Sequence, residues 1–269
     1  MQRRATLPID PLGILGVVGL AVLWWLLTTF ELVPRLFLPP PAEVFDFLVN
    51  NFVSSDYLEN YHLGSLGLSG SLLYTIGNVL LALAISCVLG ISLGLTSARV
   101  DGVRAVFDPI VLTVGTIPVL VTAPFFLIWF GTERAPQVAL LTLYDTTIIY
   151  MFAQRAVANL DPIYRAAART LGASPVRVIA QVYLAGTLPE VFGGIRIAMA
   201  GAWGLEAVAE LLGAPAGIGR VIQAVASATD VPTIVATILA LALVAVVFDA
   251  AFAAFFGFIT RWRARAVRP

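Results

Sequence analysis

The sequence has no lysine, because all 16 of its basic residues are arginine. A phosphate-binding P-loop needs a lysine to reach the β- and γ-phosphates of a nucleotide, so this chain has no site of that type. Cys87 is the only cysteine, which excludes a disulfide framework, and with His62 as the only histidine we expect no metal site. If a nucleotide drives this protein, a separate polypeptide must bind it.

Charged residues of either sign are also scarce. They make up 12% of the 269 residues, whereas a soluble domain has about 25%. The hydrophobic share is 59%, and the net charge of zero gives no reason to expect a nucleic-acid partner. With a mean hydropathy of +0.94, the composition indicates an integral membrane protein. A membrane-spanning helix needs roughly 20 residues, so the length suits about six spans.

Six charge-poor stretches predict an all-α transmembrane fold with about six helices. The stretches cover residues 11–30, about 71–98, 109–132, 135–156, 191–212 and 231–259. The last three are interrupted by charges, namely Asp145 in the fourth, Arg196, Glu206 and Glu210 in the fifth, and Asp249 in the sixth.

The arginines fall mainly on one side of these predicted spans. Six spans place both ends of the chain on the same side, and that side collects every arginine except Arg35, Arg134 and Arg220. Cytoplasmic loops carry the excess of basic residues in membrane proteins, so we expect both termini in the cytoplasm. The predicted divisions are a tail at 1–10, a transmembrane domain at 11–260 and a basic tail at 261–269.

The loop between the fourth and fifth spans, about residues 159–189, has the signals of two short capped helices. Asp161-Pro162 is typical of a helix start, and Gly172 suits the left-handed position after a helix end. Ser174-Pro175 repeats the start signal, and the second helix is expected over residues 176–184. A loop built in this way on the cytoplasmic side predicts a docking surface for a soluble partner.

Short motifs along the chain resemble those of one family of transport proteins. The alanines at 166–168 with Gly172 and Leu188-Pro189 look like the EAA loop of binding-protein-dependent ABC importer permeases. The nearest branch contains aliphatic-sulfonate, taurine and nitrate permeases. Further motifs follow the family's order over about residues 35–260, at Leu38-Pro39, Asp108-Pro109, Ile117-Pro118, Trp129-Phe130-Gly131, Gly194-Ile195-Arg196-Ile197, Ala202-Trp203, Ala209-Glu210 and Gly217-Ile218-Gly219.

The resemblance implies a type I ABC importer permease fold with a cytoplasmic coupling-helix loop that docks on an ATPase. It also implies a second permease subunit, identical or paralogous, two cytoplasmic ATPase subunits that hold ATP and Mg, and an extracytoplasmic substrate-binding protein. The chain itself would hold no cofactor, perform no catalysis and span the bacterial cytoplasmic (inner) membrane. The residues implied in coupling are Arg165, Ala166, Ala167, Ala168, Arg169, Leu171, Gly172, Ala173 and Ser174.

Three positions depart from the family's pattern. Ala166 stands where an acidic residue is usual, and Ala185 where a proline is usual. In the fourth span, Asp145-Thr146-Thr147 replaces apolar residues around a proline. The first two departures concern the affinity for the ATPase, and the third concerns the substrate.

The carboxylates inside predicted spans need an explanation, because a charge at the centre of a membrane helix costs about 2.5–3.5 kcal/mol. Asp145, Glu206 and Asp249 could pair with an arginine, bond to a nearby threonine or face a water-filled path. An anion importer would need Asp145 and Glu206 turned away from the path, or neutralised by Arg155 or Arg196. The candidate path residues are Asp145, Thr146, Trp203, Glu206 and Glu210.

Two functions remain open from the sequence. By resemblance, the substrate of an importer would be a small polar solute such as a sulfonate, taurine or a nitrate-like anion. The alternative is a proton-coupled secondary transporter in which Asp145 and Glu206 carry the protons.

Overall fold

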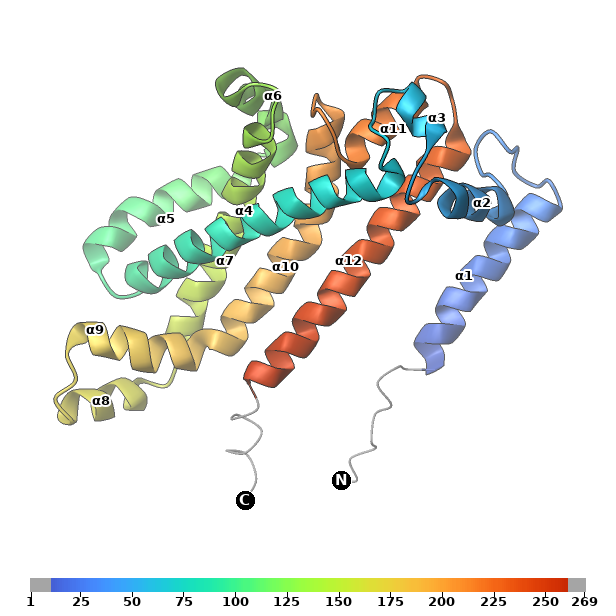
Figure 1. The fold of residues 1–269 in the computed structure, drawn as a ribbon. Helices are drawn as coiled ribbons and strands as arrows, with labels where there is room; N and C mark the ends of the chain where they lie inside the picture. The colour runs from blue at the N-terminus through green and yellow to red at the C-terminus, as the bar shows by residue number, and fades with distance from the viewer. Residues whose placement is uncertain (1–10, 261–269) are drawn as a thin grey trace. The chain divides into compact units, whose positions relative to one another are not determined.

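The computed structural model describes residues 11–260, and within that range every regular element is helical (Figure 1). The chain divides into two compact units. Unit 1 comprises the described residues up to Gly70 together with Val221–Ala240, and unit 2 comprises Ser71–Arg220 and the described residues from Leu241 onward. The tails predicted at 1–10 and 261–269 lie outside the described residues.

In unit 1, side-chain hydrogen bonds join segments that are distant in the sequence. The Trp24 indole Nε1 donates to the Pro39 carbonyl at 2.9 Å, and the Tyr57 hydroxyl donates to the Asp230 carboxylate at 2.5 Å. Burial and this hydrogen bond raise the pKa of Tyr57, so the hydroxyl remains a donor. The helices of this unit are α1 (Pro11–Thr29), α2 (Pro41–Asn51) and α3 (Asp56–Asn60), with parts of α11 (Ile218–Ala226) and α12 (Val231–Ile259).

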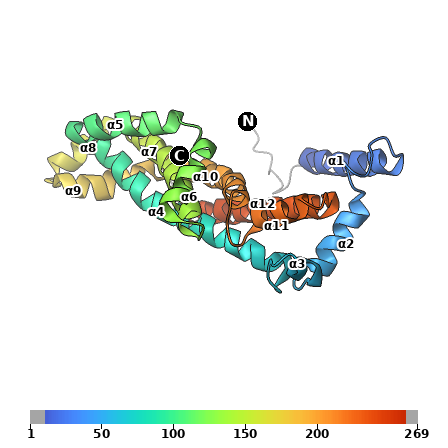
Figure 2. The same cartoon turned by 90° about the horizontal axis from the view of Figure 1, so that it is seen from above.

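Unit 2 is built around two long helices, α7 and α10, which lie against each other (Figure 2). Leu141 and Ile149 of α7 and Met199 of α10 are buried in this unit. The α10 backbone approaches so closely that a Cβ atom at Gly201 would meet the ring and hydroxyl of Tyr144. Small residues permit such close helix packing in membranes. Unit 2 also contains the first residues of α11 and the second part of α12, and it includes all but the first four residues of α4. Its helices are α4 (Gly67–Ser97), α5 (Asp101–Thr116), α6 (Val119–Phe130), α7 (Ala135–Ala158), α8 (Pro162–Thr170), α9 (Pro175–Val178), the π-helical turn η1 (Ile179–Tyr183) and α10 (Leu184–Leu211).

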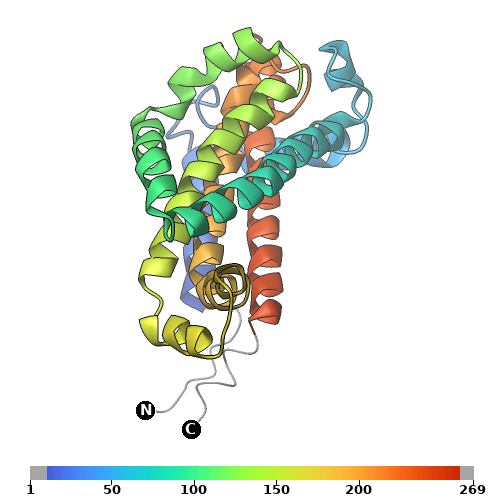
Figure 3. The ribbon, with the colours of Figure 1, turned by 90° about the vertical axis from the view of Figure 1, so that its left-hand side faces the viewer.

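The prediction of one continuous third span at 109–132 is wrong. The chain forms α5 and α6 instead, bent by 104° at their junction (Figure 3). Pro118 has no amide hydrogen, and it restricts the residue before it to extended backbone. Ile117 accordingly has ψ 126°, so helical hydrogen bonding stops there.

The count of apolar spans is lower than the six predicted. Among residues 11–260, four helices are long and apolar enough to cross a membrane, and the bent pair α5–α6 would make a fifth. The predicted fourth span, α7, is a helix of 24 residues that does not reach this apolarity, since it carries polar residues such as Gln137, Asp145 and Thr147. These three side chains are buried inside unit 2. A polar membrane helix is expected to face the protein interior in this way.

The fifth span is longer than predicted. The second helix of the loop was expected to end near residue 184, separate from a span at 191–212. Instead, α9, η1 and α10 follow one another without a break from Pro175 to Leu211. Pro189 lies inside α10 and does not interrupt it.

Candidate functional site

The predicted caps of the loop at 159–189 are confirmed. The Asp161 carboxylate accepts a hydrogen bond from the Ile163 amide at 2.9 Å, and the Ser174 hydroxyl accepts one from the Arg177 amide at 3.3 Å. Gly172 has φ +77°, the left-handed conformation that favours glycine. These contacts hold α8 and α9 as a helical hairpin, which Figure 1 shows beyond the end of α7.

The hairpin exposes large apolar side chains. Leu171 is 87% exposed, Val176 75%, Ile163 64% and Tyr164 59%. Contiguous apolar side chains on a surface usually mark an interaction site. Of the predicted coupling residues, Arg165, Ala168 and Ala173 are partly buried, whereas the exposed ones are Ala166, Ala167, Arg169, Leu171, Gly172 and Ser174.

The prediction from sequence missed Ile163, Tyr164 and Val176 as parts of this surface. Their signal was available, because large apolar residues stand on both sides of Gly172 in a segment predicted to lie outside the membrane. The prediction concentrated on the alanines at 166–168 and therefore overlooked these three residues.

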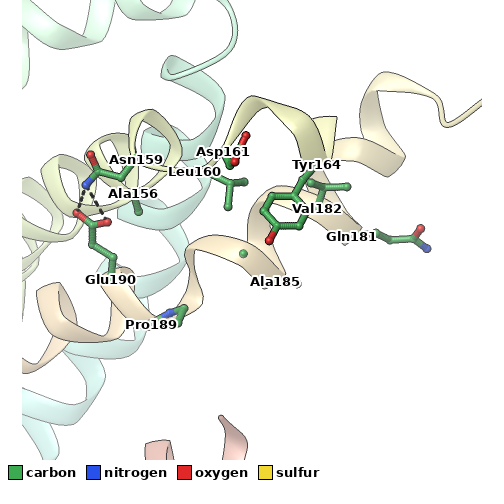
Figure 4. Close-up of a pocket in the computed structure, with 11 residues that line it drawn as sticks. Ala156, Asn159, Leu160, Asp161, Tyr164, Gln181, Val182, Ala185, Pro189 and Glu190 are labelled. Carbon is green, nitrogen blue, oxygen red and sulfur yellow. Dashed lines mark hydrogen bonds between the residues drawn. The ribbon is translucent and has the colours of Figure 1, made fainter. Parts of the chain in front are cut away.

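A groove of about 870 Å³ lies between the hairpin and the start of α10. Figure 4 shows Leu160 and Tyr164 on one side of it and Ala185 and Pro189 of α10 on the other. At its end, the Asn159 amide donates to both oxygens of the Glu190 carboxylate, at 3.0 and 3.1 Å. We call this space the loop groove.

The predicted path residues Glu206 and Glu210 are fully buried and face α4. The Asn78 amide donates to Glu206 at 2.6 Å, and the Thr75 hydroxyl donates to Glu210 at 2.7 Å. The Gly219 amide donates to the second oxygen of Glu210 at 2.8 Å. The carboxylates therefore connect α10 with α4 and with the first turn of α11.

Three other predicted path residues are held inside unit 2. Asp145 is fully buried, and its carboxylate has no hydrogen-bond partner among the described residues. The Thr146 hydroxyl and the Trp203 indole nitrogen are likewise buried without a partner in that part of the chain. The Trp203 ring packs on Phe248 of α12, with centroids 5.3 Å apart.

The arginines considered as neutralising partners are engaged elsewhere. Arg196 binds Asp249 through two hydrogen bonds, of 2.5 and 2.6 Å, which is the arginine pairing considered for this aspartate. Arg155 lies 3.7 Å from Glu190. Neither arginine therefore pairs with Asp145 or Glu206.

The bend between α5 and α6 forms one wall of a second cavity, of about 580 Å³, which we call the bend hollow. Its other walls are α7, through Tyr144 and Thr147, and α10, through Gly201 and Gly204. None of the predicted path residues Asp145, Thr146, Trp203, Glu206 and Glu210 lines it, because they occupy other faces of the same two helices. Their assignment to a path stays a prediction.

The bend hollow contains no carboxylate among its lining residues. Its polar groups are the Tyr144 and Thr147 hydroxyls and the backbone freed at Ile117-Pro118. The first turn of α6 points its amide groups towards the break, and the N-terminus of a helix favours negative charge. Discontinuous helices of this type mark the binding sites of several transporter folds.

The family model described as "Binding-protein-dependent transport system inner membrane component" matches residues 86–265. The chain is 29% identical to the taurine transport system permease protein TauC of Escherichia coli (strain K12), over 97% of this chain and 91% of that protein. It is 30% identical to the formylaminopyrimidine transport permease protein ThiX of Halalkalibacterium halodurans, over 70% of this chain and 76% of that protein.

A solved structure supports the fold. The MetNI methionine ABC transporter, in an inward-facing conformation, superposes with a TM-score of 0.64 at 19% identity, over 72% of this chain and 96% of that chain. At this identity the similarity concerns the fold alone.

Proposed function

This chain belongs to the family of binding-protein-dependent transport system inner membrane components, and we propose that it docks its ATPase partners through the loop at 159–189. The chain is a membrane-spanning permease of an ATP-driven importer. Such permeases work with ATPase and substrate-binding partners. Membership of this family does not favour the alternative function, a proton-coupled secondary transporter.

The observation that carries the docking proposal is the exposed apolar surface of a hairpin held by two capped helix starts. An isolated helix as short as α8 is marginal in water, so its caps and the Gly172 turn are needed to fix its shape. Leu171 and Val176 remain exposed on that fixed shape. A rigid apolar surface of this type suits burial in a cleft of a soluble partner.

The helix that follows the hairpin supports a mechanical role. Because α9, η1 and α10 are continuous, a displacement of the hairpin moves α10 directly, and α10 lines the bend hollow. ATP binding would bring the ATPases together and shift the permease between inward-facing and outward-facing states. For this, ATP must favour one of these states over the other.

The remaining parts of the assembly follow the family's pattern. Two permease subunits, identical or paralogous, would enclose the path, and two ATPase subunits would bind ATP and Mg on the cytoplasmic side. A substrate-binding protein would deliver the solute from outside. The distribution of arginines supports cytoplasmic termini in a bacterial inner membrane. No group in the chain would perform catalysis or hold a cofactor.

For the substrate, we propose a small polar anion of the sulfonate, taurine or nitrate type, held at the bend hollow. The hollow offers the Tyr144 hydroxyl and the amide end of α6 as donors, without an acidic residue in its lining, whereas the Thr147 hydroxyl donates to the Leu143 carbonyl. Glu206 and Glu210 instead bind groups of α4 and α11. They therefore do not oppose an anion there.

Docking is tested by placing a carboxylate in the apolar surface, with Leu171→Asp and Tyr164→Asp. An interface hot spot contributes about 2 kcal/mol or more, so each change should remove most of the ATPase that co-purifies with the permease. The level of the permease in the membrane should not change, since both side chains are exposed.

The matched control is Asn50→Asp, which adds the same charge at an exposed position of α2. Retention of the ATPase in the control and its loss in both loop variants is the expected result. Normal co-purification with Leu171→Asp and Tyr164→Asp would show that the ATPase docks elsewhere.

A further inference from the structure

A third cavity in unit 2, of about 350 Å³, lies beside α8 on the side opposite the exposed apolar surface. It is lined by residues that follow the last turn of α4, by the first turn of α5 and by the last turns of α7. Four arginines, Arg99, Arg104, Arg155 and Arg165, share this lining. We call it the arginine pocket.

Two of these four arginines already have a carboxylate partner. Arg104 lies 3.1 Å from Asp108, and Arg155 lies 3.7 Å from Glu190. The one acid in the lining, Asp161, accepts from the Ile163 amide as the cap of α8. Arg99 and Arg165 have no ion pair with any described residue, so the pocket keeps uncompensated positive charge.

Arg99 is held in place rather than free to turn into solvent. Its guanidinium carbon lies 3.7 Å from the centre of the Tyr183 ring, and its Nε is buried without a hydrogen-bond partner among the described residues. Burial and the nearby charges of Arg165 and Arg169 lower the pKa of Arg99. A fixed guanidinium with a buried, unused donor is a costly arrangement unless an acceptor is supplied.

We propose that the arginine pocket binds a phosphate-type oxyanion through Arg99 and Arg165. A guanidinium presents its donors in a planar fork that matches phosphate oxygens, and the cavity has room for such a group. The pocket lies at the cytoplasmic ends of α4 and α7. Two sources can therefore supply the anion: the headgroup of an anionic phospholipid or free phosphate.

An anion bound there would tie α8 to the end of α4, because Arg165 belongs to α8 and Arg99 follows α4. The bound anion would thus restrain the hairpin from moving away from the spans. The functional meaning of this restraint rests on the proposed docking role of the loop, whereas anion binding by Arg99 and Arg165 does not.

The binding is measured on the full-length permease without its ATPase, in phosphatidylcholine nanodiscs. Phenylglyoxal modifies accessible guanidinium groups, and mass spectrometry of peptides gives the rate at each arginine. Inorganic phosphate is the free-anion probe, and nanodiscs with added phosphatidylglycerol are the lipid probe. We expect slower modification of Arg99 and Arg165, and no change at Arg177, which is exposed in the same loop outside the pocket.

Substitutions of single arginines show which side chains bind the anion. With Arg165→Gln, phosphate should protect Arg99 about tenfold more weakly, which corresponds to ~1.4 kcal/mol. Arg99→Gln should do the same for Arg165, and Arg177→Gln should leave protection unchanged. Because Arg165→Gln removes a partly exposed side chain, it tests the pocket even if Arg99→Gln fails to fold.

The two probes distinguish free phosphate from the headgroup of an anionic lipid as the source of the bound anion. Protection by phosphate in phosphatidylcholine indicates a free anion, and protection only with phosphatidylglycerol indicates a lipid. Equal protection of Arg177, absence of protection by both probes, or protection only after the ATPase is added would overturn the proposal. The last result would assign the arginines to carboxylates of the partner. Because the assay contains no ATPase, failure of the docking proposal would leave its result unaffected.

Discussion

At the scale of single residues, Glu210 shows how a carboxylate can be accommodated inside a membrane protein without facing a path. One of its oxygens accepts from Thr75 and the other from the Gly219 amide. The Thr75 oxygen in turn accepts from the Ile218 amide at 3.0 Å. The donors at the start of α11 are thereby satisfied by side chains, as a buried helix start requires.

The Gly217-Ile218-Gly219 motif is explained by this contact. Gly217 has φ +107°, and a Cβ atom on it would meet the Glu210 carboxylate. A Cβ atom at Gly219 would meet the Ala207 carbonyl. Both glycines are therefore needed for the backbone to approach α10.

Gly219→Ala should destabilise the permease by about 1–3 kcal/mol, the usual cost of forcing extra atoms into a packed interior. The Ala207 carbonyl belongs to a helix backbone and cannot move aside. The unfolding midpoint in detergent measures the change. Gly204→Ala in α10 is the control, since a Cβ there meets nothing within 4 Å. Equal midpoints for the two variants would contradict the account of the motif.

Local contacts could be predicted from the sequence at this scale, and distant ones could not. Asp161, Gly172 and Ser174 act on groups within a few residues, so their roles as caps and turn were predictable. The side-chain partners of Glu206 and Glu210, Asn78 and Thr75, lie in α4, more than a hundred residues earlier in the chain. No local pattern identifies such a pair, so the sequence left path-facing and structural interpretations open.

At the scale of helices, apolar length predicted where most elements lie but not where they bend. Pro109, Pro124 and Pro189 all lie inside helices, whereas Pro118 separates two. Neighbouring helices can satisfy the groups that a membrane proline frees, so tertiary packing decides which proline breaks the chain. The bend hollow depends on that choice, and the sequence could not predict it.

Gly172→Pro should uncouple ATP hydrolysis from uptake. Proline requires φ near −65°, whereas the turn between α8 and α9 has φ +77°, so the hairpin cannot form its present shape. ATP hydrolysis and solute uptake are measured together in proteoliposomes of the full transporter. Gly172→Asn is the control, because asparagine tolerates the left-handed region; it should keep most of the coupling. Full uptake with Gly172→Pro would exclude the turn from the coupling mechanism.

At the scale of the whole molecule, the number of membrane crossings must be consistent both with the distribution of arginines and with the lengths of the apolar helices. Arg196 does not count as a cytoplasmic arginine, because it pairs with Asp249 between two apolar helices. The remaining bias still favours cytoplasmic ends and a cytoplasmic hairpin. If the polar helix α7 also crosses the membrane, the number of crossings depends on the pair α5–α6, which is either one broken span or a re-entrant segment.

Labelling at three positions distinguishes these two topologies. If α4, the α5–α6 pair and α7 each cross once, Ser54→Cys and Thr132→Cys face outside and Thr170→Cys faces the cytoplasm. If the pair is re-entrant, Thr132→Cys moves to the side opposite Ser54→Cys, and Thr170→Cys moves to the same side as Ser54→Cys. Each variant is made in a Cys87→Ala background and exposed in whole cells to a maleimide that cannot cross the membrane.

We expect labelling at 54 and 132 and none at 170 until the membrane is permeabilised. The reason is electrostatic: a re-entrant pair would place Arg155, Arg165, Arg169 and Arg177 outside, against the bias that orients membrane helices. It would also remove the proposed docking surface from the ATP-containing side. Labelling of position 170 in intact cells would therefore overturn both the topology and the docking proposal.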